Sequence, residues 1–215
     1  MRTLAVDFSS ERRSVAVLNG MQVTGQAAEL GGRATHPFAL IETALREANW
    51  EREAVECLAV GLGPGSYAGI RSAIALAQGW QVARGIRLLG ISSVEALAAQ
   101  AQAAGMLGSV HFLIDAQRGE FYTASYEILD GVTLRSVLDL RVASAGEVQN
   151  TTQRGRLVVS QDLSSRFPGA VVMQPDAAAL GRLAQHRTDY VSGDRLQPIY
   201  LRETSFVKAP PPRVT

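Results

Sequence analysis

The chain has 215 residues, of which 47% are apolar and 19% are charged, and its formal net charge is +1. This composition is typical of a globular protein and excludes extensive disorder. The charges are dispersed and form no basic cluster, which argues against a protein that binds nucleic acid by itself. The sequence shows no signal-peptide pattern and no apolar run of membrane-spanning length, so we expect a cytoplasmic protein without a membrane partner.

The residue types that commonly carry chemistry are sparse. The single cysteine, Cys57, lies in the apolar run 57–60, which predicts a buried side chain rather than a nucleophile. The three histidines, His36, His111 and His186, are far apart in the sequence and form no His-x-x-x-His pair. The sequence therefore predicts no metal site, no cofactor and no catalytic residue.

The first 108 residues follow the order strand, strand, strand, helix, strand, helix, strand, helix, which is the order of a ribonuclease-H-like unit. Asn19-Gly20 predicts a two-residue hairpin between the second and third strands. A capping box, Ser92 with Glu95, predicts the start of the third helix. The expected strands are residues 4–8, 15–18, 23–28, 57–60 and 88–91, and the expected helices begin near Pro37, after Ser66 and after Ser92.

The second half begins in the same way. Residues 112–115 resemble residues 4–7, because each run is an apolar strand that ends in aspartate, and Asp130-Gly131 repeats the hairpin signal. The repetition predicts an internal duplication, with two unrelated hairpins as the alternative. Further expected elements are strands at 121–129, 132–142 and 157–160, a short helix capped by Ser144 and Glu147, and a helix at 175–186.

A duplicated ribonuclease-H-like unit resembles the architecture of the actin-like ATPase superfamily (ASKHA). We therefore expect an α/β fold with two halves, residues 1–108 and a reduced half at residues 109–215 that includes a C-terminal tail. Active members hold nucleotide between the halves, with an aspartate- and glycine-containing turn from each half near the phosphates. The corresponding turns here, residues 7–10 and 115–119, lack the tight Asp-X-Gly that lets backbone approach phosphate.

The glycine-rich segment 61–69 follows a strand and opens a helix, a setting in which backbone N–H groups can bind an anion. It matches neither G-x-G-x-x-G nor the Gly-Lys-Ser/Thr pattern, and no lysine lies near it. A sharp turn with close helix packing is the structural alternative. The candidates for a nucleotide- or anion-binding site are Asp7, Gly63, Gly65 and Ser66.

Five segments together resemble the TsaB (YeaZ) family. The similarity runs from residue 2 to about residue 208, and Gly-Pro-Gly-Ser with the trailing Gly-Ile-Arg is its most specific part. The segments are LAVDFSS at 4–10, GLGPGSYAGIR at 61–71, GISSVEAL at 90–97, IDAQRGEFY at 114–122 and PIYLR at 198–202.

The resemblance implies a non-catalytic subunit of the complex that forms threonylcarbamoyladenosine in tRNA. The family is a degenerate paralogue of TsaD, the catalytic subunit, which carries a His-x-x-x-His metal site in the helix after its third strand. Here His36 occupies the first position and Leu40 the second. The implied partners are a TsaD-like subunit and a TsaE-like ATPase, with homodimerisation through the same surface and tRNA contacted only through the complex.

The resemblance also places the partner surface on the first two helices. We expect Phe38, Ile41 and Leu45 to face the sheet. The expected partner surface then consists of His36, Leu40, Ala44 and Ala73, the last three lying off the sheet-facing stripe, with ordinary core positions as the alternative.

Two departures from the family pattern fall near this surface: Tyr67-Ala68 replaces the usual Phe-Thr, and Pro37 replaces a serine. Two other functions fit the expected fold. An independent ATP-dependent kinase or phosphotransferase is disfavoured by the altered phosphate turns. A glycoprotease-like peptidase is disfavoured because no metal pair occurs and Ser66 does not lie in a G-x-S-x-G motif.

Overall fold

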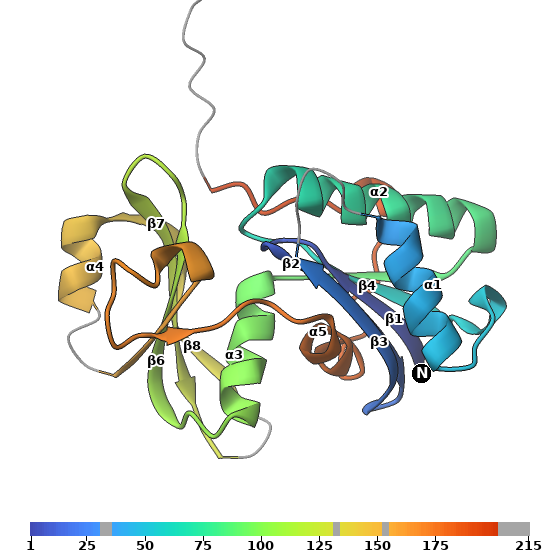
Figure 1. The fold of residues 1–215 in the computed structure, drawn as a ribbon, viewed down its shortest axis with the longest axis horizontal. Helices are drawn as coiled ribbons and strands as arrows, with labels where there is room; N and C mark the ends of the chain where they lie inside the picture. The colour runs from blue at the N-terminus through green and yellow to red at the C-terminus, as the bar shows by residue number, and fades with distance from the viewer. Residues whose placement is uncertain (31–35, 131–133, 152–154, 202–215) are drawn as a thin grey trace, which may run out of the picture.

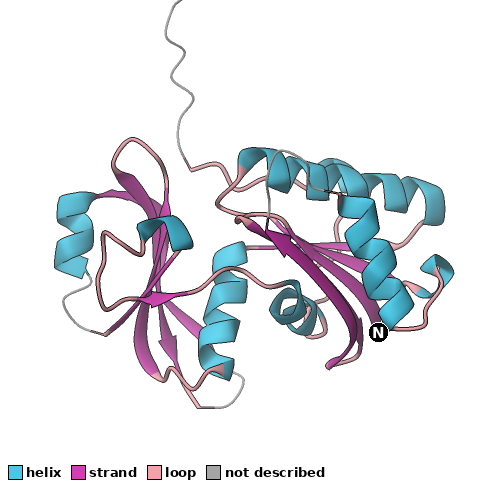
Figure 2. Ribbon diagram, viewed as in Figure 1, coloured by secondary structure: helices cyan, strands magenta, loops and turns pink. Residues whose placement is uncertain are grey.

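The structure is a computed structural model that describes residues 1–30, 36–130, 134–151 and 155–201. It contains two five-stranded sheets, one in each half of the chain, with helices between and outside them (Figures 1 and 2). The first sheet consists of β1 (Arg2–Asp7), β2 (Arg12–Asn19), β3 (Gln22–Leu30), β4 (Cys57–Gly61) and β5 (Arg87–Ile91). The second consists of β6 (Gly108–Asp115), β7 (Glu120–Ile128), β8 (Leu134–Ser144), β9 (Arg156–Val159) and β10 (Val171–Val172).

The two sheets have the same topology. The first has the order β3-β2-β1-β4-β5 and the second, written from its other edge, β8-β7-β6-β9-β10. In each, the first three strands along the chain are antiparallel and the last two are added in parallel. This correspondence supports the predicted duplication and confirms the expected actin-like, ribonuclease-H-like architecture.

Helices cover both faces of each sheet and form layers across the molecule (Figure 1). Helices α1 and α2 cover the outer face of the first sheet, α5 and α3 lie between the sheets, and α4 packs on the far side of the second. No helix among the described residues is long and apolar enough to cross a membrane. The helices are α1 (Pro37–Glu47), α2 (Tyr67–Arg84), α3 (Ser93–Ala103), α4 (Ala145–Thr151) and α5 (Ala177–Ala184), with short 3-10 turns at Arg52–Ala54, Gln161–Leu163 and Gly193–Arg195.

The two faces of the first sheet differ in side-chain size because residues alternate along each strand. Leu4 and Val6 face α1 and α2, whereas Ala5 faces α5. Small side chains on that second face let α5 approach closely, and a Cβ on Gly181 would overlap the Leu18 side chain. Cys57 lies on the α5 side and is fully buried, as expected, and burial raises its pKa to about 12.

Each half of the chain contributes one sheet, and the second sheet begins with Gly108, but the helices that follow the last strand of each half are exchanged. Helix α3 packs against the second sheet, where Leu97 contacts the cluster around Phe112. Helix α5 returns to the first sheet, where Leu180 joins the cluster around Leu18. The segment 109–215 is therefore not a separately packed unit, because its last helix completes the core of the first half.

Most of the turns and helix caps that the sequence predicts occur in the structure. Gly20 has a φ of 57° in the hairpin between β2 and β3, as Asn19-Gly20 predicts. Ser144 and Glu147 bond reciprocally at the start of α4, as a capping box should. Ser92 caps α3, but Glu95 forms an ion pair with Arg187 instead of completing the box. Gly131 of the hairpin signal Asp130-Gly131 lies outside the described residues, together with residues 132 and 133.

The expected orientation of α1 is correct for Ile41 and Leu45, which are buried, but wrong for Phe38. Phe38 is 65% exposed, whereas Leu40 and Ala44 are buried together with Ile41 and Leu45. The helix therefore turns the stripe 40, 41, 44 and 45 toward the sheet. Ala73 on α2 is also fully buried, in the same hydrophobic cluster as these four residues. Leu40, Ala44 and Ala73 are core residues and do not form an exposed partner surface.

Candidate functional site

Asp7, at the end of β1, is fully buried, and its carboxylate bonds within the chain. Its Oδ1 accepts hydrogen bonds from the Ser9 amide at 2.9 Å and the Ser9 hydroxyl at 2.6 Å, and its Oδ2 accepts one from the Ser93 hydroxyl at 2.8 Å. Burial raises the pKa of Asp7, although these hydrogen bonds oppose that shift. The carboxylate thus ties β1 to the start of α3.

The glycine-rich segment packs against the same turn. The Ser93 hydroxyl accepts a hydrogen bond from the Gly63 amide at 3.1 Å, and the Ser66 amide donates to the Ser9 carbonyl at 2.7 Å. A Cβ on Gly65, which has a φ of 147°, would overlap the Ser9 carbonyl. Glycine is therefore required here for close packing between two segments of the protein itself.

Arg13 on β2 is a residue of this region that the sequence analysis missed. Its Nη2 donates to the Ser66 hydroxyl at 3.0 Å, and Ser66 caps α2 by accepting from the Gly69 amide at 3.4 Å. The Nε and Nη1 atoms of Arg13 are buried without hydrogen-bond partners among the described residues. Burial lowers the pKa of Arg13, and the charges of Asp7 and Glu29 oppose that shift. The only signal for Arg13 in the sequence is that a charged residue closely precedes the apolar run 15–18.

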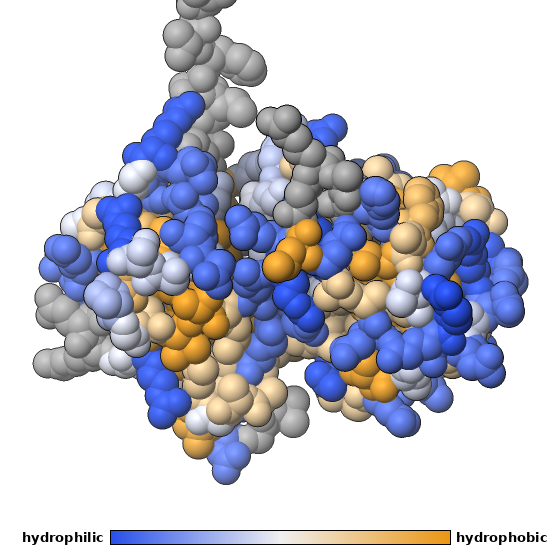
Figure 3. Space-filling model, viewed as in Figure 1, coloured by the Kyte–Doolittle hydropathy of each residue, from blue (hydrophilic) through white to orange (hydrophobic). Residues whose placement is uncertain are grey.

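A cleft with a volume of about 430 Å³ lies between the two halves. Gly65 and Ser66 line it, but Asp7 and Gly63 do not. Figure 3 shows hydrophilic and hydrophobic residues side by side where the halves meet. The four candidate residues of the expected nucleotide site therefore lie near one another, yet only two of them face the cleft in which a nucleotide would lie.

The second half contributes Asp115, at the end of β6, to this cleft. Its Oδ1 accepts from the Gln117 amide at 2.8 Å and its Oδ2 from the Gln117 side chain at 2.9 Å. Gln117, Arg118 and Gly119 all have positive φ, at 63°, 58° and 78°. This turn corresponds by topology to the turn after Asp7, but Asp115 faces the cleft and Asp7 does not.

The charge of the cleft is unlike that of a phosphate site. Three carboxylates line it, from Glu11, Asp115 and Asp162, and the described residues of its lining include no arginine, lysine or histidine. Phosphate groups are normally bound by backbone N–H groups, cations or metal ions. Within the described part of the chain, no group of three or more His, Cys, Asp or Glu side chains could hold a metal ion.

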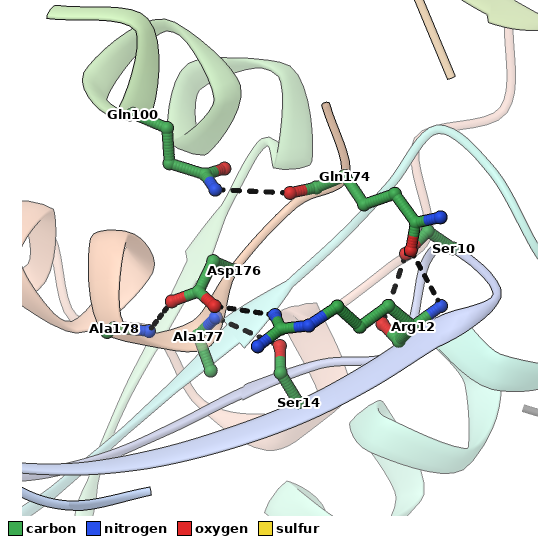
Figure 4. Close-up of polar contacts among 8 residues, drawn as sticks. All are labelled: Ser10, Arg12, Ser14, Gln100, Gln174, Asp176, Ala177 and Ala178. Atoms are coloured by element: carbon green, nitrogen blue, oxygen red, sulfur yellow. Dashed lines mark hydrogen bonds and ion pairs between the residues drawn. The ribbon is translucent and has the colours of Figure 1, made fainter. Parts of the chain in front are cut away.

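A set of contacts joins the segment before α5 to the first half (Figure 4). Arg12 donates its amide to Gln174 Oε1 at 3.0 Å and its guanidinium to Asp176 Oδ2 at 2.5 Å. The Ser14 hydroxyl accepts from the Ala177 amide at 3.0 Å, and Gln100 donates to the Gln174 carbonyl at 3.1 Å. These contacts fix the segment that crosses between the halves at one side of the cleft.

The outer faces of α1 and α2 carry several exposed residues. His36 is exposed at the start of α1, where its amide donates to Glu29 Oε1 at 3.1 Å, and Phe38 follows it. Tyr67 on α2, where the family pattern usually has phenylalanine, is 59% exposed and stacks on Tyr200 with ring centroids 5.5 Å apart. The exposed positions on α2 include a stripe of small or short side chains at Ala68, Ser72, Ala75, Gly79 and Val82.

The chain is similar in sequence to proteins named for the synthesis of threonylcarbamoyladenosine in tRNA. A family model described as TsaD, tRNA N6-adenosine threonylcarbamoyltransferase, matches residues 37–190. The chain is 28% identical to the tRNA threonylcarbamoyladenosine biosynthesis protein TsaB of Haemophilus influenzae, over 96% of each chain. It is 32% identical to TsaB of Escherichia coli over 129 residues, which cover 59% of this chain and 55% of that protein.

The solved structure of YeaZ from Pseudomonas aeruginosa has the same fold. Its TM-score is 0.78 at 27% identity, and the match covers 93% of this chain and 100% of that one. The similarity thus extends across both halves of the chain.

Proposed function

The chain belongs to the TsaD family and, within it, to the TsaB (YeaZ) family of tRNA threonylcarbamoyladenosine biosynthesis proteins, and we propose that it is a non-catalytic subunit that binds the TsaD-like catalytic subunit. In this role the chain supports the reaction without contributing a reacting group. Its further partners would be a TsaE-like ATPase and, through the complex, tRNA.

The main support for a non-catalytic role is the environment of Asp7. In an actin-like ATPase the aspartate after the first strand should lie near the phosphates. Here its two carboxylate oxygens bond to Ser9 and Ser93, and it does not line the cleft. The carboxylate holds the fold together and is not available to a nucleotide in the cleft.

For the partner surface we propose the outer faces of α1 and α2, with His36 and Phe38 on α1 and the small-residue stripe on α2. Small side chains allow a partner helix to approach closely, and an exposed aromatic residue can provide an anchor for the interface. Leu40, Ala44 and Ala73 would support these helices from below, because they are buried in the core. A homodimer would use the same faces.

The test is reconstitution of threonylcarbamoyladenosine formation on tRNA with the TsaD-like and TsaE-like proteins of the same organism. We expect product only when this chain is present, and we expect Asp7→Asn to retain activity while the protein stays folded. An Asp7→Asn protein with a native circular dichroism spectrum that binds the partner but yields no product would contradict the non-catalytic role. ATP turnover by the isolated chain that disappears on Asp7→Ala would favour the kinase alternative.

A further inference from the structure

We propose that the groove between α3 and α5 binds a small organic monoanion, a carboxylate on an alkyl chain. This groove has a volume of about 370 Å³ and shares no lining residue with the cleft that the glycine-rich segment lines. The inference does not depend on the proposed function, because the groove lies outside the proposed partner surface on α1 and α2. It rests on the apolar lining of the groove and on the basic side chains at its rim.

The apolar lining comes from two helices that lie next to each other between the sheets (Figure 1). On each helix the lining residues recur four positions apart, so they share one face. Most of them are alanines, and these short side chains leave space between the helices. The apolar residues of the groove are Ala99 and Ala103 on α3, Ala179 and Leu183 on α5, Met21 in the hairpin between β2 and β3, and Leu134 at the start of β8.

One permanent charge at the groove is unmatched. Arg182 on α5 is exposed, and its guanidinium forms no hydrogen bond or ion pair with any residue that the structure describes. Asp176 is the one acid of the described lining, and it is already matched by the Arg12 guanidinium and the Ala178 amide. A single unmatched positive charge favours a singly charged anion over a doubly charged phosphate group.

His186 adds a hydrogen-bond donor beside this charge. It lines the groove from the turn after α5, four positions beyond Arg182, and its side chain has no partner among the described residues. A neutral imidazole carries one N–H donor, and a guanidinium presents a fork of donors that matches a carboxylate. The two oxygens of one carboxylate would therefore be bound by the two side chains together.

The end of α5 does not use these basic side chains for its own stability. Basic residues near a helix C-terminus commonly bond the last carbonyl groups. Here the carbonyl groups of residues 182–184 accept from the amides of residues 185–187, at 3.1, 3.1 and 3.3 Å. Arg187, the next basic residue, forms ion pairs with two carboxylates. Arg182 and His186 thus differ from it in keeping their side-chain donors for a ligand.

The size of the groove favours a small molecule over a protein segment. Small-molecule pockets span about 300–1,000 Å³, and this groove, at about 370 Å³, lies near the lower end. The carboxylate would lie at the rim with Arg182 and His186, and the alkyl chain would lie along the alanines and Leu183. Because each buried methylene group adds favourable free energy, affinity should rise with chain length.

The test uses octanoate as the probe, octanamide as its uncharged analogue and butyrate as its short analogue. Binding to the full chain is followed by chemical shifts of backbone amides. We expect octanoate to shift residues 99–103 and 179–186 saturably, and to bind at least about fivefold more tightly than octanamide and tenfold more tightly than butyrate. Equal binding of octanoate and either analogue, the absence of saturable shifts, or tighter binding of inorganic phosphate to the same residues would overturn the proposal.

Variants of the full chain test the charged rim. Arg182→Gln should reduce the preference for octanoate over octanamide to within about twofold, because it removes the guanidinium that distinguishes them. Arg156→Gln, at an exposed arginine on β9 outside the groove, should keep the preference. An Arg182→Gln protein that prefers octanoate as strongly as Arg156→Gln does would overturn the proposal.

A second pair of variants tests the apolar part of the groove. Ala103 and Ala104 are neighbours and both are exposed, but only Ala103 lines the groove. Ala103→Trp should weaken octanoate binding at least about fivefold, because the indole takes the space in which the alkyl chain would be buried, and Ala104→Trp should change it less than about twofold. Circular dichroism of both variants checks that they are folded. Equal effects of the two substitutions would exclude the groove as the site.

Discussion

The guanidinium of Arg12 lies 2.5 Å from Oδ2 of Asp176, and the other carboxylate oxygen of Asp176 caps α5 by accepting from the Ala178 amide at 2.8 Å. One side chain therefore both starts the helix and anchors it to β2, 164 positions away along the chain. The side chains of Arg12 and Asp176 are 38% and 22% exposed, so solvent screens the pair only in part. This contact links the two halves through the exchanged helix.

Replacing Asp176 tests both of its roles. Asp176→Ala should lower the free energy of unfolding by roughly 1–3 kcal/mol, since it removes a helix cap and a charge-assisted hydrogen bond. Asp176→Asn keeps a capping oxygen and should cost less. Urea denaturation monitored by circular dichroism measures both changes.

A double-mutant cycle with Arg12→Met isolates the pair. If Asp176→Asn costs the same free energy with and without Arg12, the ion pair contributes nothing to stability and only the cap matters. If Asp176→Ala leaves stability unchanged, both roles are refuted.

Local patterns in the sequence carried much of the fold. Alternation of apolar residues and Asn19-Gly20 were enough to predict β1, β2 and β3, because the rules for hairpins are local. The repeated apolar strand ending in aspartate predicted the second sheet, and with it the actin-like architecture. The strand β10 was missed because its two residues, Val171 and Val172, are too few to show a pattern.

Features that depend on long-range packing could not be predicted. The spacing of Phe38, Ile41 and Leu45 fits a helical face as well as the buried stripe does, and only the position of the sheet decides between them. The exchange of α3 and α5 depends on how both sheets pack, and no local sequence pattern specifies that packing. The roles of Arg13 and Asp176 likewise depend on partners far away along the chain.

Two glycines on α2 should respond oppositely to the same substitution. A Cβ on Gly69 would overlap the Arg13 guanidinium and the Phe8 carbonyl, whereas a Cβ on Gly79 would meet nothing within 4 Å. Gly69→Ala should therefore destabilise the protein, and Gly79→Ala should stabilise it by up to about 1 kcal/mol, because alanine favours helix more than glycine does. Thermal melting of both variants checks this. Equal melting temperatures would show that the contact at Gly69 relaxes freely.

The buried carboxyl of Asp7 predicts a pH dependence. Burial raises its pKa above the ordinary value of 3.8, so the stability that it contributes is fully present below that value and is lost as pH rises through its pKa in the folded protein. Asp7→Asn cannot ionise, so its stability relative to wild type should increase as the pH rises above about 4. Urea midpoints measured at a series of pH values from about 4 upward give the difference.

Asp189 provides a control of opposite sign. A hydrogen bond from Arg187 lowers its pKa to about 2, so the stability that it contributes is present above its ordinary pKa of 3.8 and is lost as pH falls toward about 2. Wild type should therefore gain stability relative to Asp189→Asn as pH rises through this range. A constant difference between Asp7→Asn and wild type across pH would contradict the predicted shift at Asp7.

Substitutions at two alanines of α2 distinguish the proposed partner surface from the core. Ala75 lies in the exposed stripe, whereas Ala73 is fully buried beneath α2. Ala75→Glu should leave the melting temperature nearly unchanged but weaken binding to the TsaD-like partner by about 2 kcal/mol or more, because it would bury an unpaired charge in the interface.

Ala73→Glu should unfold the isolated chain, because it places the same charge in a closed core. Melting curves and calorimetric titration with the partner measure the two effects, with Asp130→Ala, at an exposed position in the second half, as a control for a surface change outside both helices. A folded Ala75→Glu protein that binds the partner with unchanged affinity would exclude the α2 stripe from the interface, and a folded Ala73→Glu protein that loses only partner binding would restore Ala73 to it.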